Sequence, residues 1–276
     1  MPSSGADARQ FYRTLFLSDL HLGARASRAD VVRTFLRTVE AETIYLVGDI
    51  FDLWHGGRVH WSAAHDDVLE DLRDRARAGA RIVYLPGNHD TVMRAPDARI
   101  EGWELREAVI HKAADGRRYL VLHGDQCDPR ILRWHAMTRL GSRLDGSLRQ
   151  LDHWIQAAAG PFDPARTPGQ RVIGWANQLL AMGDRFENRL TTLARAAGAR
   201  GVICGHSHKP GLRSTRDGMV FANCGDWVDS LTALAEDRDG RLQLLRHGTE
   251  ALKAPARPAE GLPRPAEGGA LAGGIA

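Results

Sequence analysis

The sequence predicts an α/β fold: a layered α/β/α sandwich with mixed sheets and a helical insertion. Short apolar runs rich in β-branched and aromatic residues alternate with amphipathic stretches in the first half of the chain. Asp-Gly pairs, which favour tight hairpins, separate strand-like runs in the second half. The chain has 276 residues, of which 43% are hydrophobic and 26% charged, so it is long enough to bury one substantial core.

Six apolar runs are predicted to be buried strands. They are Thr14–Leu17, Thr43–Val47, Arg81–Leu85, Tyr119–Leu122, Val202–Cys204 and Met219–Ala222. The amphipathic stretches Arg28–Glu40 and Ser62–Ala78 are predicted to be helices, and Gly79 is expected to end the second one. Hairpin signals predict a more antiparallel second half, and they stand at Asp115–Gly116, Asp217–Gly218 and Asp239–Gly240.

Two segments depart from this pattern. Over about residues 126–200 the strand pattern stops and apolar residues recur at steps of three and four, which predicts a helical insertion. Residues 254–276 are mostly Pro, Gly, Ala and Glu, a composition that does not offset the entropy lost on ordering. We therefore expect one domain over residues 1–253, including the insertion, followed by a disordered tail.

Composition excludes several classes of protein. The net charge of +3 is too balanced to predict a nucleic-acid partner. The three cysteines form no CxxC pair, so neither a disulfide framework nor a thiolate zinc site is expected. The sequence shows no signal-peptide core and no stretch of roughly 18 apolar residues. We expect a cytoplasmic protein, at most peripheral on the cytoplasmic membrane face, and the oligomeric state stays open.

Five short polar motifs each follow a predicted strand. They are SDLHLG at Ser18–Gly23, GDIFD at Gly48–Asp52, GNHD at Gly87–Asp90, HGD at His123–Asp125 and GHSH at Gly205–His208. Open α/β sheets commonly bind ligands at the carboxyl ends of their strands. Carboxylate, imidazole and amide groups are costly to bury unpaired, and a metal centre explains why they gather there. One such motif alone is usually a surface turn, but five predict a metal centre.

The spacing within the motifs supports this interpretation. Asp19 and His21 stand two residues apart on extended backbone, so both side chains can reach one ion, and His206 and His208 repeat the arrangement. A carboxylate such as Asp49 can bridge two cations. Mixed nitrogen and oxygen donors without thiolates suit Mn, Fe, Zn or Ni better than Ca.

The order DxH, GD, GNH, HGD and GHxH, over about Leu15 to Trp227, resembles the calcineurin-like metallophosphoesterase superfamily. The resemblance implies two divalent ions, Mn first among the candidates. It implies that Asp19, His21, Asp49 and His208 hold one ion and that Asp49, Asn88, His123 and His206 hold the other. His89 matches a histidine that is not a ligand but contacts the phosphoryl oxygens or protonates the leaving group. Two such ions would activate a water, so no protein nucleophile is needed.

Within that superfamily the chain is more closely similar to UDP-2,3-diacylglucosamine diphosphatase-like enzymes of lipid A biosynthesis. The stretches that carry this similarity are FLSDLHLG, IYLVGDIFDLW, YLPGNHD, YLVLHGDQ, VICGHSH and NCGDWVDSLTAL. The similarity implies hydrolysis of a pyrophosphate or phosphodiester bond in a nucleotide-linked lipid or related phospholipid. It also implies that Asp128, Arg171 and Asn177 bind substrate. One departure is that His89 stands where the best-known diphosphatases have Arg, which leaves another substrate of this class open.

The insertion has a distinctive composition. It contains eleven Arg and no Lys against six acidic residues, together with three of the seven Trp. This composition predicts a lid that recognises substrate and touches a membrane surface, and a cap packed on the core is the alternative. Two other functions stay open: a soluble phosphodiesterase or phosphatase acting on cyclic nucleotides or other small phosphoesters, and a non-catalytic interaction module. The complete ligand set argues against the module.

Overall fold

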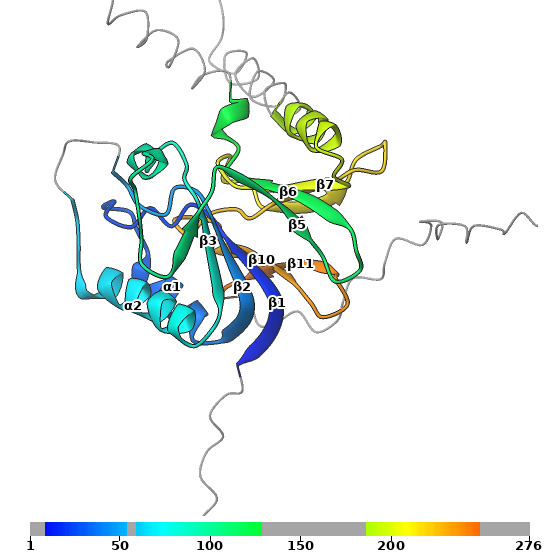
Figure 1. Ribbon diagram of the computed structural model, residues 1–276. Helices are drawn as coiled ribbons and strands as arrows, with labels where there is room; N and C mark the ends of the chain where they lie inside the picture. The colour runs from blue at the N-terminus through cyan, green and yellow to red at the C-terminus, as the bar shows by residue number, and fades with distance from the viewer. Residues whose placement is uncertain (1–8, 54–58, 129–185, 249–276) are drawn as a thin grey trace, which may run out of the picture.

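Two β-sheets packed face to face form the centre of the computed structural model, which describes residues 9–53, 59–128 and 186–248 (Figure 1). The first sheet has the order β11-β10-β1-β2-β3-β4. Its strands are β1 (Gln10–Leu17), β2 (Val39–Val47), β3 (Arg81–Leu85), β4 (Trp103–Leu105), β10 (Thr232–Glu236) and β11 (Leu242–Arg246). The second sheet has the order β5-β6-β7-β9-β8. Its strands are β5 (Ala108–Lys112), β6 (Arg118–Leu122), β7 (Gly201–Cys204), β8 (Gly211–Ser214) and β9 (Val220–Asn223).

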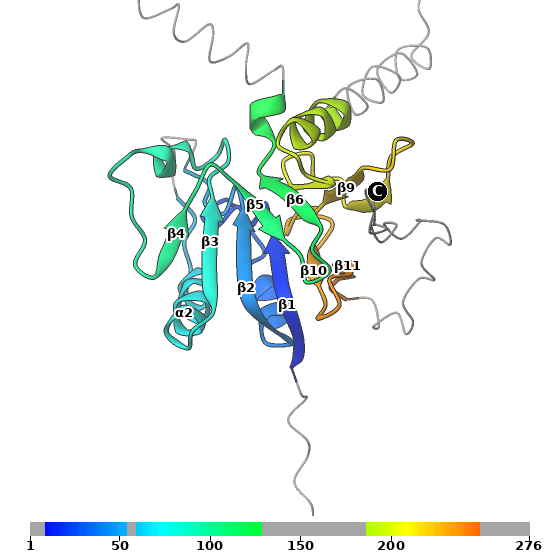
Figure 2. The ribbon, with the colours of Figure 1, turned by 45° about the vertical axis from the view of Figure 1, so that its right-hand side comes forward.

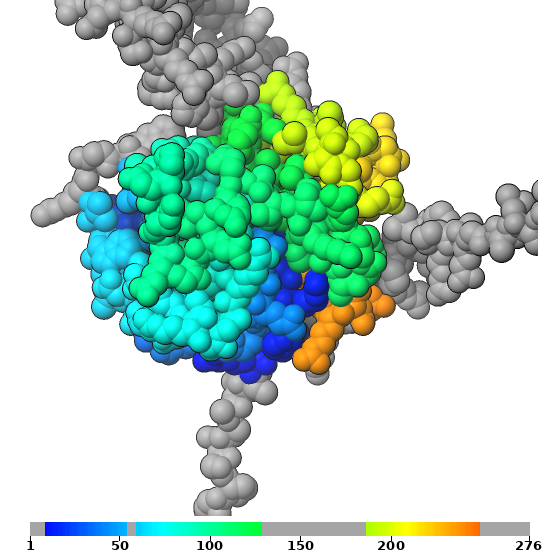
Figure 3. All heavy atoms as spheres, viewed as in Figure 1, coloured from blue at the N-terminus to red at the C-terminus, as the bar shows by residue number. Residues whose placement is uncertain are grey.

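Helices cover the outer faces of both sheets. Helices α1 (Ala29–Leu36) and α2 (Ala63–Arg77) pack on the first sheet, and a helix over residues 186–196 packs on the second (Figure 2). Two short 3-10 helices, η1 (Thr91–Arg94) and η2 (Asp125–Cys127), follow β3 and β6. The segment from β4 to β6 runs from the first sheet to the second across the face seen in Figure 3. The predicted layered sandwich with mixed sheets is confirmed.

Burial on both faces explains the continuous apolar runs of the central strands. In β1, Leu15 and Leu17 pack toward the helices, whereas Phe16 belongs to the core between the two sheets. Strands β1, β2 and β3 pair in parallel, the arrangement in which strands are usually buried on both sides. All six predicted strands are present. The three Asp-Gly pairs lie in the hairpins β5-β6, β8-β9 and β10-β11, as predicted.

One helix prediction was too long. The predicted helix Arg28–Glu40 ends at Leu36 as α1, and Val39 already begins β2 beside β1. Val39 and Ala41 are buried on one side of that strand. Over so short a stretch, the spacing of apolar residues does not distinguish the period of a helix from that of a strand. The second prediction, Ser62–Ala78, matches α2 closely, and Ser62 donates its backbone N–H to His65 Nδ1 at the start of this helix.

The insertion and the tail are described only in part. Residues 129–185 of the predicted insertion lie outside the described residues, as does the tail at 254–276. The helix at residues 186–196 agrees with the helical prediction for the end of the insertion. The proposed domain boundaries stay a prediction. In the described part of the chain no helix has the length and apolar character needed to span a membrane.

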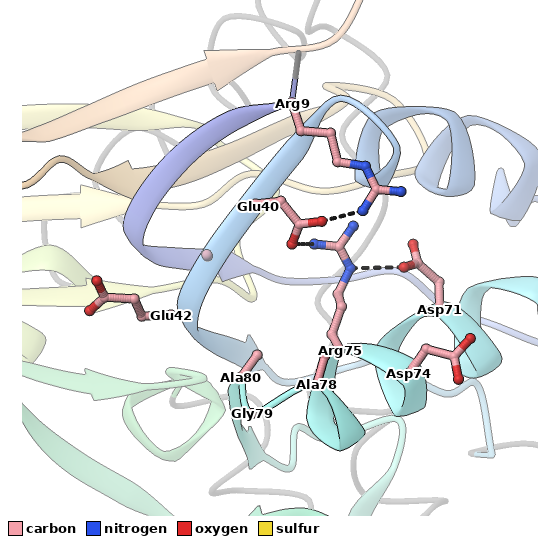
Figure 4. A pocket seen from close by; sticks show the side chains of 10 residues that line it. Arg9, Glu40, Glu42, Asp71, Asp74, Arg75, Ala78, Gly79 and Ala80 are labelled. Carbon is pink, nitrogen blue, oxygen red and sulfur yellow. Dashed lines mark hydrogen bonds and ion pairs between the residues drawn. The ribbon is translucent and has the colours of Figure 1, made fainter. Parts of the chain in front are cut away.

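A pocket of about 490 Å³ lies beside the start of β2 and the end of α2 (Figure 4). Arg75 of α2 forms one wall, and its side chain is buried. The guanidinium donates to Asp71 and Glu40, at 2.8 and 3.0 Å, and to the carbonyl oxygens of Leu36 and Val39. These contacts connect α2 to the end of α1 and to β2, so the role of Arg75 is structural.

A buried carboxylate joins the two sheets. Glu236 of β10 is fully buried and accepts hydrogen bonds from Thr14 Oγ1 and from the backbone N–H of Ala114, both at 2.7 Å. Its Oε2 lies 2.7 Å from Nε2 of His111, which belongs to the facing sheet. Burial raises the pKa of Glu236, but these hydrogen bonds lower it more strongly, to about 2. The carboxylate is therefore ionised at neutral pH and stabilises the packing of the sheets.

This network predicts an acid-sensitive contribution to stability. Because the folded-state pKa of Glu236 lies below its ordinary value of 4.5, the contribution is present above pH 4.5 and is lost as the pH falls toward 2. The shift corresponds to up to about 3 kcal/mol. Glu236→Gln should lower the free energy of unfolding at pH 7 and flatten its decline over that acid range. Urea unfolding of metal-free protein measures both effects, with exposed Glu42→Gln as the control; an unchanged acid profile would contradict the prediction.

Candidate metal centre

The five polar motifs meet at the carboxyl ends of β1, β2, β3, β6 and β7. The backbone N–H groups of Asp19 and His21 donate to the carbonyl oxygens of Gly48 and Asp49, each at 2.9 Å. In the second sheet, the N–H of Gly205 donates to the carbonyl of His123 at 3.0 Å. These bonds continue the strand pairing beyond the strands within each sheet. The N–H of His206 donates to Asp19 Oδ2 at 3.0 Å, which joins a loop of the second sheet to a loop of the first.

The backbone is strained where the predicted ligands stand. Among the non-glycine residues that the structure describes, six have a positive φ. They are Asp19, His21, Asp49, His206, His208 and Leu231, with φ between 47° and 65°. Five of these six are predicted ligands. The extended backbone expected at the pairs Asp19 and His21, and His206 and His208, is therefore wrong, because these residues are left-handed. Such a conformation is unfavourable for residues other than glycine and persists only where the surrounding structure enforces it. The strain therefore marks the loops that aim these side chains at a common point.

Two glycines allow the loops to approach closely. A Cβ on Gly205 would lie 1.8 Å from Ser18 Oγ and 2.5 Å from Asp19 Oδ2. A Cβ on Gly87 would lie 2.2 Å from Asp49 Oδ1 and 2.8 Å from His123 Cδ2. Any side chain at either position would push the loops apart, so the close packing of the loops requires glycine there.

The potential ligand atoms fall into two main groups. Donor atoms of Asp19, His21 and His208 lie within 4.8 Å of one another, and so do those of Asp49, His123 and His206. A third group joins His21, Asp49 and His89. Asn88 precedes His89, whose backbone N–H donates to Asp49 Oδ1 at 2.7 Å. All seven predicted ligands thus lie on loops that meet at one site.

Three buried atoms of this cluster form no hydrogen bond of normal geometry in the described part of the protein: Asp19 Oδ1, Asn88 Oδ1 and His123 Nε2. Asp19 Oδ1 and His123 Nε2 each face another potential ligand, His208 Nε2 at 3.1 Å and Asp49 Oδ2 at 3.3 Å. The other carboxylate oxygen of Asp19 accepts from Ser18 Oγ at 2.6 Å and from the N–H of His206 at 3.0 Å. Buried polar atoms are costly when unpaired. The unpaired atoms come from three loops and are donors that a divalent cation accepts, so the residues fit a metal site.

The tautomer of His123 also fits a ligand. Its Nδ1 lies 2.9 Å from the carbonyl oxygen of Val47. A proton on Nδ1 donates to that carbonyl and leaves the Nε2 lone pair facing the cluster, the arrangement in which a backbone acceptor orients a metal-binding imidazole. Nε2 lies 3.3 Å from Asp49 Oδ2.

The pKa values of Asp49 and His123 reflect the negative charge that is buried in this cluster. Burial raises the pKa of Asp49, but the adjacent charge of His123 and the hydrogen bond from the His89 backbone lower it more strongly. Burial lowers the pKa of His123, yet the adjacent charge of Asp49 raises it to about 10. Without a cation, a proton on His123 therefore offsets the carboxylate. A divalent ion supplies this positive charge and releases the proton.

His89 lies at the edge of the cluster and is partly exposed. Its Nδ1 is 2.9 Å from Asp52 Oδ1, and its ring packs edge-on against His21 with the ring centres 4.7 Å apart. Asp52 thus orients the imidazole that the sequence singled out. No role was predicted for Asp52, although it ends the motif GDIFD, three residues after Asp49.

Two further buried residues support the loops and were not predicted. Asp90 accepts the backbone N–H groups of Ile50 at 2.8 Å and Gly87 at 2.5 Å, which ties GNHD to GDIFD. Asn223 donates to the carbonyl oxygen of Gly205 at 2.7 Å, which holds the GHSH loop. The stretch NCGDWVDS contains Asn223 and could have indicated it.

The three predicted substrate-binding residues have different outcomes. Asp128 lies beside the cluster, with Oδ2 at 3.0 Å from His206 Nε2. Arg171 and Asn177 lie outside the described residues. Cys204 and Cys224 are buried free thiols, in keeping with the expectation that the cysteines form no disulfide framework.

Comparisons with known proteins identify the family. The model of the calcineurin-like phosphoesterases matches residues 12–210. The UDP-2,3-diacylglucosamine hydrolase of Xanthomonas campestris pv. campestris is 29% identical over 246 residues, which cover 82% of this chain and 96% of that protein. The protein of the same name from Ralstonia nicotianae is 29% identical over 226 residues, covering 77% and 82%. A mutant of Vps29 from Entamoeba histolytica is 15% identical, covers 84% of this chain and 97% of its own, and gives a TM-score of 0.41. Since the matched model spans well over half of the sequence, the chain belongs to the calcineurin-like phosphoesterase family and is a metal-dependent hydrolase.

Proposed function

We propose that this enzyme hydrolyses the pyrophosphate bond of a nucleotide-linked lipid with two divalent ions bound at the cluster. The main support for the proposal is that two groups of potential ligand atoms lie together on five loops at the ends of strands. Among the described residues, three buried atoms of the cluster form no hydrogen bond of normal geometry. One ion is assigned to Asp19, His21, Asp49 and His208. The other ion is assigned to Asp49, Asn88, His123 and His206.

The donor set guides the choice of metal. Nitrogen and oxygen donors without thiolates favour Mn, with Fe, Zn or Ni as alternatives. Asp49 lies close to both groups, since its donor atoms are within 4.8 Å of His21 from one group and of His123 and His206 from the other. We therefore assign Asp49 as the bridging carboxylate.

When bound, two such ions supply an activated water and offset the charge of the phosphoryl group. The chain contributes His89, which Asp52 holds in a fixed orientation at the partly exposed edge of the cluster. From there the imidazole donates a hydrogen bond to a phosphoryl oxygen or a proton to the leaving group. The backbone N–H of His89 stays on Asp49, so the same residue links the proposed bridge and the proposed acid.

The substrate class comes from the relatives and from the sequence. Two relatives that match most of this chain are named UDP-2,3-diacylglucosamine hydrolases. The arginines and tryptophans of the insertion suit phosphates and acyl chains, and we propose that it binds substrate and a membrane surface. Asp128, Arg171 and Asn177 are proposed to contact substrate. A peripheral position on the cytoplasmic membrane face fits such a substrate.

The bridging assignment can be tested with Asp49→Asn. The amide cannot bridge two cations with negative charge, so turnover should be lost and metal content should fall while the fold is retained. Metal analysis, circular dichroism and an assay with bis(p-nitrophenyl) phosphate measure these effects. The exposed residue Asp97 supplies the control, Asp97→Asn. Near-normal activity with both ions bound would show that Asp49 does not bridge them.

The role of His89 predicts a different pattern. His89→Ala removes the imidazole but keeps the backbone N–H on Asp49, so metal content should stay normal while the chemical step slows by roughly 10²–10⁴. Asp52→Asn should cause a smaller loss, because the ring stays but is less well oriented. Loss of metal in His89→Ala would instead make His89 a ligand.

The substrate assignment can be tested with three compounds at the same Mn concentration. UDP-2,3-diacylglucosamine should be hydrolysed with a much higher kcat/KM than UDP-glucosamine, because the acyl chains contribute binding. Bis(p-nitrophenyl) phosphate should be a slow substrate that needs only the metal centre. Equal rates for the acylated and non-acylated nucleotides, or faster hydrolysis of cyclic nucleotides, would favour the alternative of a soluble phosphodiesterase.

A further inference from the structure

A single guanidinium nitrogen joins two of the metal-centre loops. Arg94, at the end of η1, donates from one NH2 nitrogen to both carboxylate oxygens of Asp125, at 3.0 and 2.9 Å. The same nitrogen lies 2.9 Å from the carbonyl oxygen of Pro86. Pro86 immediately precedes GNHD, and Asp125 ends HGD. The contact therefore holds these two loops together.

A second path closes this contact into a ring. Arg94 Nε donates to Glu107 Oε2 at 3.0 Å, and Gln126 Nε2 donates to Glu107 Oε1 at 2.5 Å. The side-chain oxygen of Gln126 accepts the backbone N–H of Gly124 at 3.1 Å. Glu107 stands between β4 and β5, where the chain passes from the first sheet to the second. The ring thus connects GNHD, HGD and the crossover between the sheets.

Burial makes the inner contact strong. The Asp125 side chain is 2% exposed, whereas that of Glu107 is 52% exposed. A nearly buried carboxylate that loses its cationic partner is costly, while an exposed pair contributes little. The Arg94 to Asp125 contact is therefore the dominant part of the ring, and the Glu107 side is a weaker brace.

We propose that Arg94 is a positioning residue that sets the affinity of one of the two metal ions. This inference rests on the proposed function, because it needs the assignment of Asn88 and His123 to the same ion. Asn88 belongs to the loop that begins after Pro86, and His123 lies two residues before Asp125. A fixed distance between these loops fixes the distance between those two ligands. The ion assigned to Asp19, His21 and His208 depends on other loops.

The test measures the two Mn affinities of the full-length, metal-free protein by calorimetry. Asn88→Ala and His208→Ala first assign the two binding steps to their sites. Arg94→Gln keeps two N–H donors but removes the charge and the planar fork, and Arg94→Lys keeps the charge and donors but not the fork. Asn88→Ala identifies one of the two Mn-binding steps, and we expect Arg94→Gln to weaken that same step. The expected loss of affinity in Arg94→Gln is about tenfold or more, the usual effect of removing a residue that orients a ligand. Arg94→Lys should lie between Arg94→Gln and the wild type.

A matched control separates positioning from general stability. Arg106 lies in the same crossover, is exposed and pairs with Glu104, so Arg106→Gln should leave both affinities unchanged. A lower melting temperature in Arg94→Gln with both affinities intact, or with both reduced equally, would overturn the inference. If Arg94→Gln does not fold, Arg94→Lys, which keeps the charge but not the fork, must show the same selective loss in smaller measure, and two normal affinities there overturn the inference.

The same experiment separates this inference from the proposed function. Two Mn ions bound by the wild type, with Arg94→Gln indistinguishable from it, would reject only the role of Arg94. A wild-type protein that binds no pair of ions would reject the proposed two-metal function and the role of Arg94 with it.

Discussion

The arrangement of the metal centre depends on the burial of two carboxylates, Asp19 and Asp49, next to several imidazoles. Two negative charges out of water repel each other, and each needs positive charge or hydrogen bonds nearby. Asp19 uses one oxygen for Ser18 and the His206 backbone, and Asp49 uses one for the His89 backbone. The remaining capacity of both carboxylates is turned toward a cation. Strand positions, strained backbone and glycine contacts all serve that geometry.

The surrounding core explains how the strain persists. The left-handed backbone at Asp19, Asp49 and His206 closely follows strands β1, β2 and β7, whose last four residues are all buried. These strands cannot slide, because a shift of one residue would turn Phe16 and its neighbours to the wrong face. The free energy of the two-sided core therefore holds loop conformations that isolated segments would not adopt. Stability and site geometry come from the same apolar contacts.

The sequence allowed prediction of the parts of the fold with strong local signals. The buried strands β1, β2, β3, β6 and β7 have dense β-branched and aromatic runs, and the Asp-Gly turns define the hairpins. Strand β4 was not predicted, and β5, β8, β10 and β11 were indicated only by the Asp-Gly turns of their hairpins. Strand β4 has only three residues. Strand β10 has the sequence TALAE, whose alanines have low β propensity, and it forms a strand because its residues are completely buried in the sheet. The ligands were predicted because their residue types repeat after strands. Asp52, Asp90 and Asn223 were missed because single polar residues give no such repeat.

The contacts that support the site share one feature that matters for its mechanism. Asp90 joins GNHD to GDIFD, Asn223 holds the GHSH loop, and Arg94 joins GNHD to HGD. Each is a polar side chain whose partners lie on the loops rather than at the reacting position. Loops fixed in this way hold the ligand atoms together before a metal arrives, so binding has little ordering entropy to overcome. The same rigidity keeps His89 at a constant distance from Asp49, because its backbone is anchored there while its side chain is held by Asp52. A site built like this can place an acid beside the phosphoryl group without rearranging its ligands.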